Sequence, residues 1–235
     1  MTHANSPPIK SFIFFFFLIT LFLGGYSLAQ AEDLQNNEED LIAYTPPARG
    51  SPSGRLGGGV RGINTKIPKI KALVPNHVGF STQDQPTLVW YINIPAELKV
   101  AISPLEEKSA NSDSIFETTI NVEKAGYQTL DLAQFNFKLK PEMDYKWTVT
   151  YLSEKDNRPV KVFSGGAIRH APMEEHLKST LNATAAQNVS DFYAKEGYWY
   201  DAVYSLTKQI QNNTDNTKHL AKMANLLKQV GLTVP

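Results

Sequence analysis

The feature that most restricts the fold is a change of hydrophobic period at Pro172. Between residues 70 and 168, short β-type runs are separated by turn residues roughly every eight to twelve positions, a spacing typical of an antiparallel sandwich. After Pro172, apolar residues recur at helical spacing. The sequence therefore predicts a segregated α+β chain in which the sheets come first and the helices follow.

The predicted strands are short and evenly spaced. They cover residues 70–74, 87–94, 99–103, 115–122, 128–132, 145–152 and 160–168. In the run 145–152, aromatic and β-branched side chains alternate with Lys and Thr, which places one aromatic-rich face inward. We therefore assign residues 69–170 to one β-sandwich domain.

A more specific signal precedes the sixth predicted strand. Leu139, Pro141 and Tyr145 have the spacing Leu-x-Pro-x-x-x-Tyr. This resembles the corner of fibronectin type III domains, in which the Tyr hydroxyl makes a hydrogen bond to the preceding turn. The resemblance implies a fibronectin type III or immunoglobulin-like sandwich, with Pro141 and Tyr145 in structural roles.

Residues 171–235 are expected to form a small helical unit. The periodic segments predict helices over about 173–181, from 184 to just before Gly197, and over about 198–211 and 217–229. Thr184 and Gln187 have the spacing of a capping box, which would start the second helix.

The second and third predicted helices share a pattern that looks like the centre of a tetratricopeptide repeat. Its structural residues are Tyr193, Gly197, Trp199 and Ala202. In such a repeat a small residue lets two helices approach while aromatic rings fill their crossing. Because a single repeat cannot bury its own apolar face, this unit must pack on the sandwich or on a partner.

The start of the chain has the pattern of a secretory signal. A polar segment with one cation, Lys10, precedes an unbroken apolar run over residues 12–23, and small residues follow at 27–31. This run is short for a membrane span, which needs about 20 apolar residues, so an uncleaved anchor is the less favoured alternative. We predict a signal peptide over residues 1–31, cut after Ala31. The mature chain would be periplasmic or extracellular and would not span a membrane.

Residues 32–68 are acidic and then rich in Pro and Gly, which predicts a disordered leader. The chain has no cysteine and therefore no disulfide. Its 23 basic and 23 acidic residues balance, which offers no general attraction to nucleic acid.

Several segments, taken in order, resemble one family. They are residues 55–62 (Arg-Leu-Gly-Gly-Gly-Val-Arg-Gly), 72–75, 86–91, 145–147 and 193–202. The family is an exported cyanobacterial one known as domain of unknown function number 928, and the resemblance covers roughly residues 49–232. It implies an exported protein of two parts with no assigned activity. Members often carry a cysteine in the strand that matches residues 148–152, so any redox role of the family does not carry over to this cysteine-free chain.

No motif predicts catalysis. The glycine-rich run lacks the Gly-Lys-Ser/Thr ending of a phosphate loop, and residues 162–166 lack the first Gly of Gly-x-Ser-x-Gly. The one local cluster with metal-ligand chemistry comprises His170, Glu174, Glu175 and His176. It straddles Pro172 without a third His nearby, so a solvated hinge is expected instead of a metal site. We predict neither an enzyme nor a cofactor.

Two groups of residues are candidates for binding. The tyrosines Tyr198, Tyr200 and Tyr204 could form an exposed platform, although a role for these aromatics in the core is the favoured alternative. Arg49, Arg55 and Arg61 could form a flexible cationic arm for an acidic glycan or partner, the alternative being a plain linker.

The function predicted from these features is that of a non-catalytic exported envelope protein, a scaffold or a module that binds another protein. The first alternative is a protein that binds an envelope glycan or another polyanion. The second is a hydrolase whose site is assembled from distant residues, with His77, His170 or His176 beside a Ser or a carboxylate.

Overall fold

The computed structural model describes residues 41–47, 54–58, 67–105, 114–155 and 158–234. Apart from Leu41, these residues belong to the unit Ile42–Pro235. The predicted signal peptide and most of the predicted leader lie outside the described residues. No helix in the described part of the chain is both long and apolar enough to cross a bilayer.

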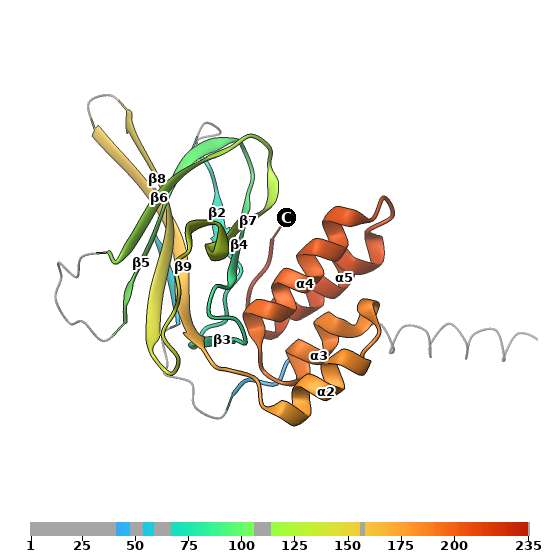
Figure 1. Ribbon diagram of the computed structural model, residues 1–235. Helices are drawn as coiled ribbons and strands as arrows, with labels where there is room; N and C mark the ends of the chain where they lie inside the picture. Colours follow the sequence, from blue (N-terminus) through green and yellow to red (C-terminus); the bar gives the residue numbers. More distant parts are fainter. Residues whose placement is uncertain (1–40, 48–53, 59–66, 106–113, 156–157, 235) are drawn as a thin grey trace, which may run out of the picture. The chain divides into compact units, whose positions relative to one another are not determined.

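Two β-sheets build the first part of the unit (Figure 1). The larger sheet has the strand order β1 (Arg55–Gly58), β9 (Arg158–His170), β8 (Asp144–Lys155), β5 (Ala96–Pro104) and β6 (Phe116–Val122). A further short strand, β3 (Gly79–Ser81), pairs in parallel with β9. The smaller sheet has the order β2 (Ile70–Ala72), β4 (Thr87–Ile92) and β7 (Gly126–Asp131). All pairings except that of β3 are antiparallel, as predicted.

Alternation of side chains explains why these segments form sheets. On β8, Tyr145, Trp147 and Val149 are buried, while Lys146 and Thr148 between them are partly exposed. Strand β4 is buried along almost its whole length because it lies between the larger sheet and the helices (Figure 1). Each predicted strand corresponds to an observed one, whereas β1 and β3 were not predicted because they are short and contain glycine.

The corner before β8 is closed by the hydrogen bond that the motif predicts. The backbone N–H of Lys140 donates to the Tyr145 hydroxyl oxygen at 3.1 Å. Leu139 and Tyr145 are both buried, and Pro141 is exposed and forms an isolated bridge with His170. The corner thereby fixes how the chain enters β8.

Four α-helices follow the sheets in the described part of the chain. They are α2 (Glu175–Ala183), α3 (Val189–Lys195), α4 (Trp199–Asn212) and α5 (Thr217–Gln229). The predicted capping box is wrong. Thr184 is the C-cap of α2, and its hydroxyl donates to the Thr180 carbonyl oxygen at 2.9 Å. A short 3-10 helix, η2 (Ala186–Asn188), separates α2 from α3.

Helix α4 packs directly on the sandwich. The indole N–H of Trp199 donates to the Leu73 carbonyl oxygen at 2.8 Å. The Trp147 indole donates to the Tyr200 hydroxyl at 2.8 Å, and that hydroxyl donates to the Ala167 carbonyl oxygen at 3.0 Å. One continuous cluster of buried apolar residues therefore runs from both sheets into α4 and α5. The alternative in which the helical unit needs a partner to bury its face does not apply to α4.

The turn between α3 and α4 depends on Gly197. Its φ of +83° lies in the left-handed region, and a Cβ there would be 3.1 Å from the Thr45 carbonyl oxygen. Ala202, one turn into α4, is fully buried. The small residues of the repeat-like motif thus lie where the chain turns and where α4 enters the core.

Part of the predicted leader belongs to the folded unit, so the prediction of disorder over residues 32–68 is wrong for 41–47 and 54–58. Ile42 and Tyr44 are buried in the main core. The Tyr44 N–H donates to Gln229 Oε1 at 2.8 Å, and Gln229 Nε2 donates to the Ile42 carbonyl oxygen at 2.7 Å. The Thr45 N–H donates to the Ala194 carbonyl oxygen at 3.1 Å. These few contacts order a segment that composition alone assigns to a linker.

Candidate functional site

Arg55 does not belong to a free cationic arm. Its Nη2 donates to the carbonyl oxygens of Val74 at 2.9 Å and Val230 at 2.8 Å. Val230 is the C-cap of α5, where backbone carbonyls carry partial negative charge and a cation is favourable. Arg55 therefore joins β1 to the loop after β2 and to the end of α5. Arg49 and Arg61 lie outside the described residues, so their binding role stays a prediction.

We expect Arg55→Met to lower the free energy of unfolding by about 2–3 kcal/mol, because a charged donor to the carbonyl oxygens of Val74, Val230 and Gly231 is lost while the aliphatic stem is kept. Urea denaturation followed by circular dichroism measures this change. Lys140→Met removes an exposed cation and is the control, with an expected change within about 0.5 kcal/mol. A change in Arg55→Met as small as that of the control would contradict this structural role of Arg55.

The three candidate tyrosines do not form one exposed platform. Tyr200 is 3% exposed and its hydroxyl is used inside the protein. Tyr198 is 8% exposed and packs with Met173 and Phe192. Tyr204 is half-buried. Tyr198 and Tyr200 therefore lie in the core, which is the alternative that the sequence favours. Of the three tyrosines, only Tyr204 stays a candidate surface aromatic.

The histidines do not assemble a reactive site among the described residues. His77 Nε2 lies 2.8 Å from the Tyr44 hydroxyl, and burial lowers the pKa of His77. His176 is exposed beside Glu174. His170 lies opposite Ser81 in the β3–β9 pairing, yet its buried Nδ1 has no hydrogen-bond partner. No group of three or more His, Cys, Asp or Glu in the described ranges could hold a metal ion.

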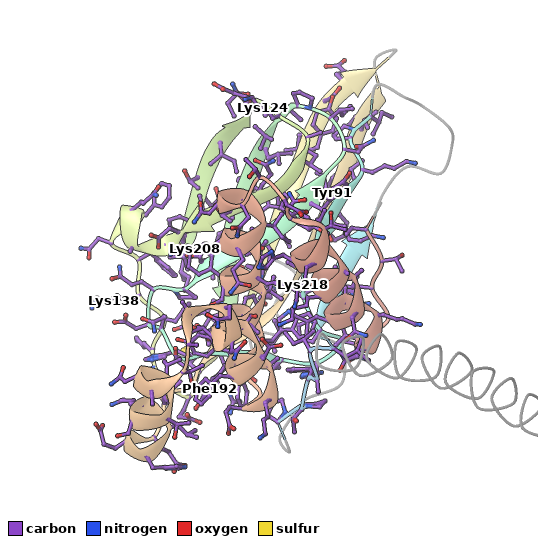
Figure 2. The ribbon with its side chains drawn as sticks, turned by 90° about the vertical axis from the view of Figure 1, so that its right-hand side faces the viewer. Tyr91, Lys124, Lys138, Phe192, Lys208 and Lys218 are labelled. Atoms are coloured by element: carbon purple, nitrogen blue, oxygen red, sulfur yellow. The ribbon has the colours of Figure 1, made fainter. Side chains whose placement is uncertain are left out.

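A cavity of about 270 Å³ lies where the loop after β3, the start of the 3-10 helix η1 (Leu132–Phe135) and the first half of α4 meet. It is lined by Ser81, Gln83, Gln85, Pro86, Thr87, Asp131, Ala133, Tyr200, Asp201 and Tyr204. Lys208, labelled in Figure 2, reaches over the Tyr204 ring with its Nζ 5.6 Å from the ring centroid. We call this cavity the α4 pocket.

Asp201 is the most unusual residue of the α4 pocket. It is 7% exposed, and burial raises its pKa from 3.8 to about 6. Two hydrogen bonds from Thr82 oppose that rise, one from the backbone N–H to Oδ2 and one from the hydroxyl to Oδ1, each at 2.9 Å. At neutral pH the protein therefore holds a carboxylate in a place that disfavours its charge, a property concentrated at functional sites.

Gln85 and Asp131 are two further polar residues of the lining. The Gln85 Nε2 atom is buried and has no hydrogen-bond partner. Asp131 Oδ1 accepts from the Ala133 N–H at 3.0 Å and caps η1. No Lys, Arg or His belongs to the lining. The α4 pocket thus combines carboxylate acceptors, an amide without an internal partner and an aromatic wall.

Sequence reasoning did not find the α4 pocket. Gln85, Asp131 and Asp201 are far apart in sequence and follow no known spacing. The one local signal is the position of Asp201 in the first turn of α4, where an acidic residue is common for reasons of helix electrostatics alone.

Comparison with known proteins identifies the family. The model of the family described as Domain of Unknown Function (DUF928) matches residues 56–234. No curated protein and no solved structure matches the chain. The family match spans both sheets and all four described α-helices. The chain therefore belongs to the Domain of Unknown Function (DUF928) family.

Proposed function

We propose that this protein is an exported, non-catalytic binding module of the cyanobacterial envelope, and that the α4 pocket is its binding site. The observation that carries the proposal is the buried Asp201 carboxylate in a cavity open to a ligand. A buried carboxylate lowers the stability of the folded protein at neutral pH, and a role in binding a ligand would explain its presence. The apolar leader at residues 12–23 supports export.

A non-catalytic role is favoured over hydrolysis by the surroundings of Asp201. A hydrolase needs a nucleophile in hydrogen-bond reach of a base. The Ser81 hydroxyl, which lines the pocket, accepts from the Gln83 N–H at 3.2 Å and donates to the Asp201 carboxylate. Ser81 is only 1% exposed, so its hydroxyl is held inside the protein and is poorly placed to attack a substrate. The described residues provide no hydrogen bond between Ser81 and a histidine.

We also propose that the scaffold combines a fibronectin-type sandwich with a tetratricopeptide-type helix pair. The strand orders β2-β4-β7 and β6-β5-β8-β9 correspond to A-B-E and C′-C-F-G of such sandwiches, and the corner bond to Tyr145 lies before the F-type strand. The helix pair α3 and α4 turns at Gly197 and buries Trp199 and Ala202. Both folds are common binding scaffolds.

The test is a thermal-shift experiment with the mature chain, residues 32–235, and fractionated envelope extract. Ala133 lines the pocket and is exposed, so Ala133→Trp should fill it without disturbing the core. Ala125→Trp, at an exposed turn before β7, is the matched control. We expect a fraction that raises the melting temperature of the wild type and of Ala125→Trp but not of Ala133→Trp.

Three results would contradict the proposal. An equal shift in both variants would place binding outside the α4 pocket. The absence of a shift with every fraction would refute binding. Mass spectrometry of the active fraction after incubation should show an unchanged ligand, and a product formed with turnover would refute the non-catalytic role.

A further inference from the structure

The charge of the α4 pocket restricts the ligand that it can hold. Its lining contains two carboxyl groups, Asp131 and Asp201, and no cation. The nearby Lys208 lies over the Tyr204 ring. A second anion placed beside these carboxylates would be repelled, and repulsion is strong where water is scarce. Uronic, sulfated and phosphorylated ligands therefore do not suit this pocket, in contrast to the acidic glycan expected for an arginine arm.

The hydrogen-bonding groups restrict the ligand further. Thr82 donates one hydrogen bond to each Asp201 oxygen, and the Ser81 hydroxyl donates a third to the carboxylate. Because a carboxylate has about four acceptor positions, Asp201 can accept one further hydrogen bond from a ligand. Gln85 lines the pocket and has a buried amide nitrogen without a partner, so this nitrogen can donate to a ligand without losing a hydrogen bond within the protein. A ligand must therefore supply donors to the carboxylates and an acceptor to the amide.

Hydroxyl groups meet both demands because each one donates one hydrogen bond and accepts others. They also suit either orientation of the Gln85 amide. An ammonium or guanidinium group has donors only, so with the Gln85 amide oriented as in the structure it would leave the amide nitrogen without an acceptor. The chemistry thus favours a polyhydroxylated neutral ligand over a basic side chain.

Size and wall chemistry agree with a small ring. The cavity of about 270 Å³ is slightly smaller than the range of about 300–1,000 Å³ that is common for ligand pockets. It therefore has room for one small unit. The half-buried ring of Tyr204 adds an apolar surface against which the C–H face of a sugar could pack.

We propose that the α4 pocket binds one neutral sugar unit of a glycan, with Asp201 and Asp131 accepting hydrogen bonds from its hydroxyl groups and Gln85 donating to one of them. This inference rests on the proposed binding function and names its ligand class. The rest of the glycan would lie outside the pocket, because the cavity has room for a single unit.

The test is isothermal titration calorimetry of the mature chain with defined probes. The neutral probes are hexasaccharides of glucose, mannose, xylose and N-acetylglucosamine, and the comparators are an alginate hexasaccharide and tetralysine. Gln85→Met removes the amide and keeps the shape, and Gln134→Met makes the same change at an exposed position of η1 outside the lining. We expect the wild type and Gln134→Met to bind a neutral hexasaccharide, and Gln85→Met to bind it about tenfold more weakly.

The melting temperature separates a binding defect from a folding defect. Because the Gln85 amide nitrogen has no partner in the protein, Gln85→Met should melt no lower than the wild type. Equal affinity in Gln85→Met, or binding of alginate or tetralysine alone, would overturn the sugar assignment. If no probe binds while an extract fraction still shifts the wild type and not Ala133→Trp, the ligand class is wrong and the pocket function stands. If no extract fraction shifts the wild type either, both proposals fail.

Discussion

Replacing Trp199 with Ala should lower the free energy of unfolding by about 3–5 kcal/mol, the largest effect that we expect from a single substitution. Trp199 is fully buried in the main core. Its indole N–H binds the Leu73 carbonyl oxygen, and its ring meets the Tyr44 ring edge-on with centroids 4.8 Å apart. The substitution thus removes contacts that join α4 to the sandwich and to the segment before β1. Urea denaturation followed by circular dichroism measures the loss.

Two further variants separate the causes of that effect. Trp199→Phe keeps most of the apolar area but leaves the Leu73 carbonyl oxygen without its donor, so we expect a smaller loss of about 1–3 kcal/mol. Phe135→Ala, at a residue 39% exposed, should cost about 1 kcal/mol or less. Because the core is continuous, the wild type should unfold in one transition. Separate transitions for sheets and helices, with Trp199→Ala affecting the helical one alone, would contradict this account.

Asp201 should make stability depend on pH. The folded protein, with a pKa of about 6, binds the Asp201 proton more tightly than the unfolded chain, with a pKa near 3.8. Between these values the native state carries more protons than the unfolded state, so the free energy of unfolding falls as pH rises. The stabilisation is fully present below pH 3.8 and lost above pH 6. A difference of about two pH units corresponds to roughly 3 kcal/mol.

Asp201→Asn is the variant that isolates this effect. Asn keeps an oxygen that accepts from the Thr82 N–H and carries no charge, so the variant should resemble the wild type at pH 4 and be more stable by up to about 3 kcal/mol at pH 7. Asp201→Ala leaves the Thr82 N–H and hydroxyl without acceptors and should be less stable than Asp201→Asn by about 1–3 kcal/mol. Denaturant unfolding from pH 4 to 7.5 measures both. An Asn variant with the same pH profile as the wild type would show that the Asp201 proton is not involved.

The gain in stability expected for Asp201→Asn has a functional meaning. A carboxylate that weakens the fold at neutral pH is retained here without a structural need for its charge, since an amide can accept the same Thr82 N–H. The sugar-binding assignment explains its presence, because a carboxylate is a stronger acceptor for hydroxyl groups than an amide oxygen. Stability and binding should therefore move in opposite directions in Asp201→Asn.

Local periodicity was enough to find the regular elements of this protein. The stacked apolar residues between 217 and 229 predicted α5 with the bounds that the structure has. The alternation in 145–152 predicted β8 and its buried face, and the Leu139 to Tyr145 motif predicted the corner bond. These features depend on residues within a few positions of one another, so backbone geometry and neighbouring side chains are sufficient to specify them.

The site and the tie between the two parts depend instead on long-range packing. Thr82 and Asp201 are 119 positions apart, and Arg55 binds a carbonyl oxygen 175 positions away. No periodic pattern in the sequence reveals such pairs. The glycine-rich segment that the sequence assigns to a linker therefore forms strand β1 in the structure, and tyrosines considered for the surface lie in the core. The residue types and their spacing specified the elements. The packing of apolar faces against one another, driven by the free energy of their burial, determines which polar groups lie together in the α4 pocket.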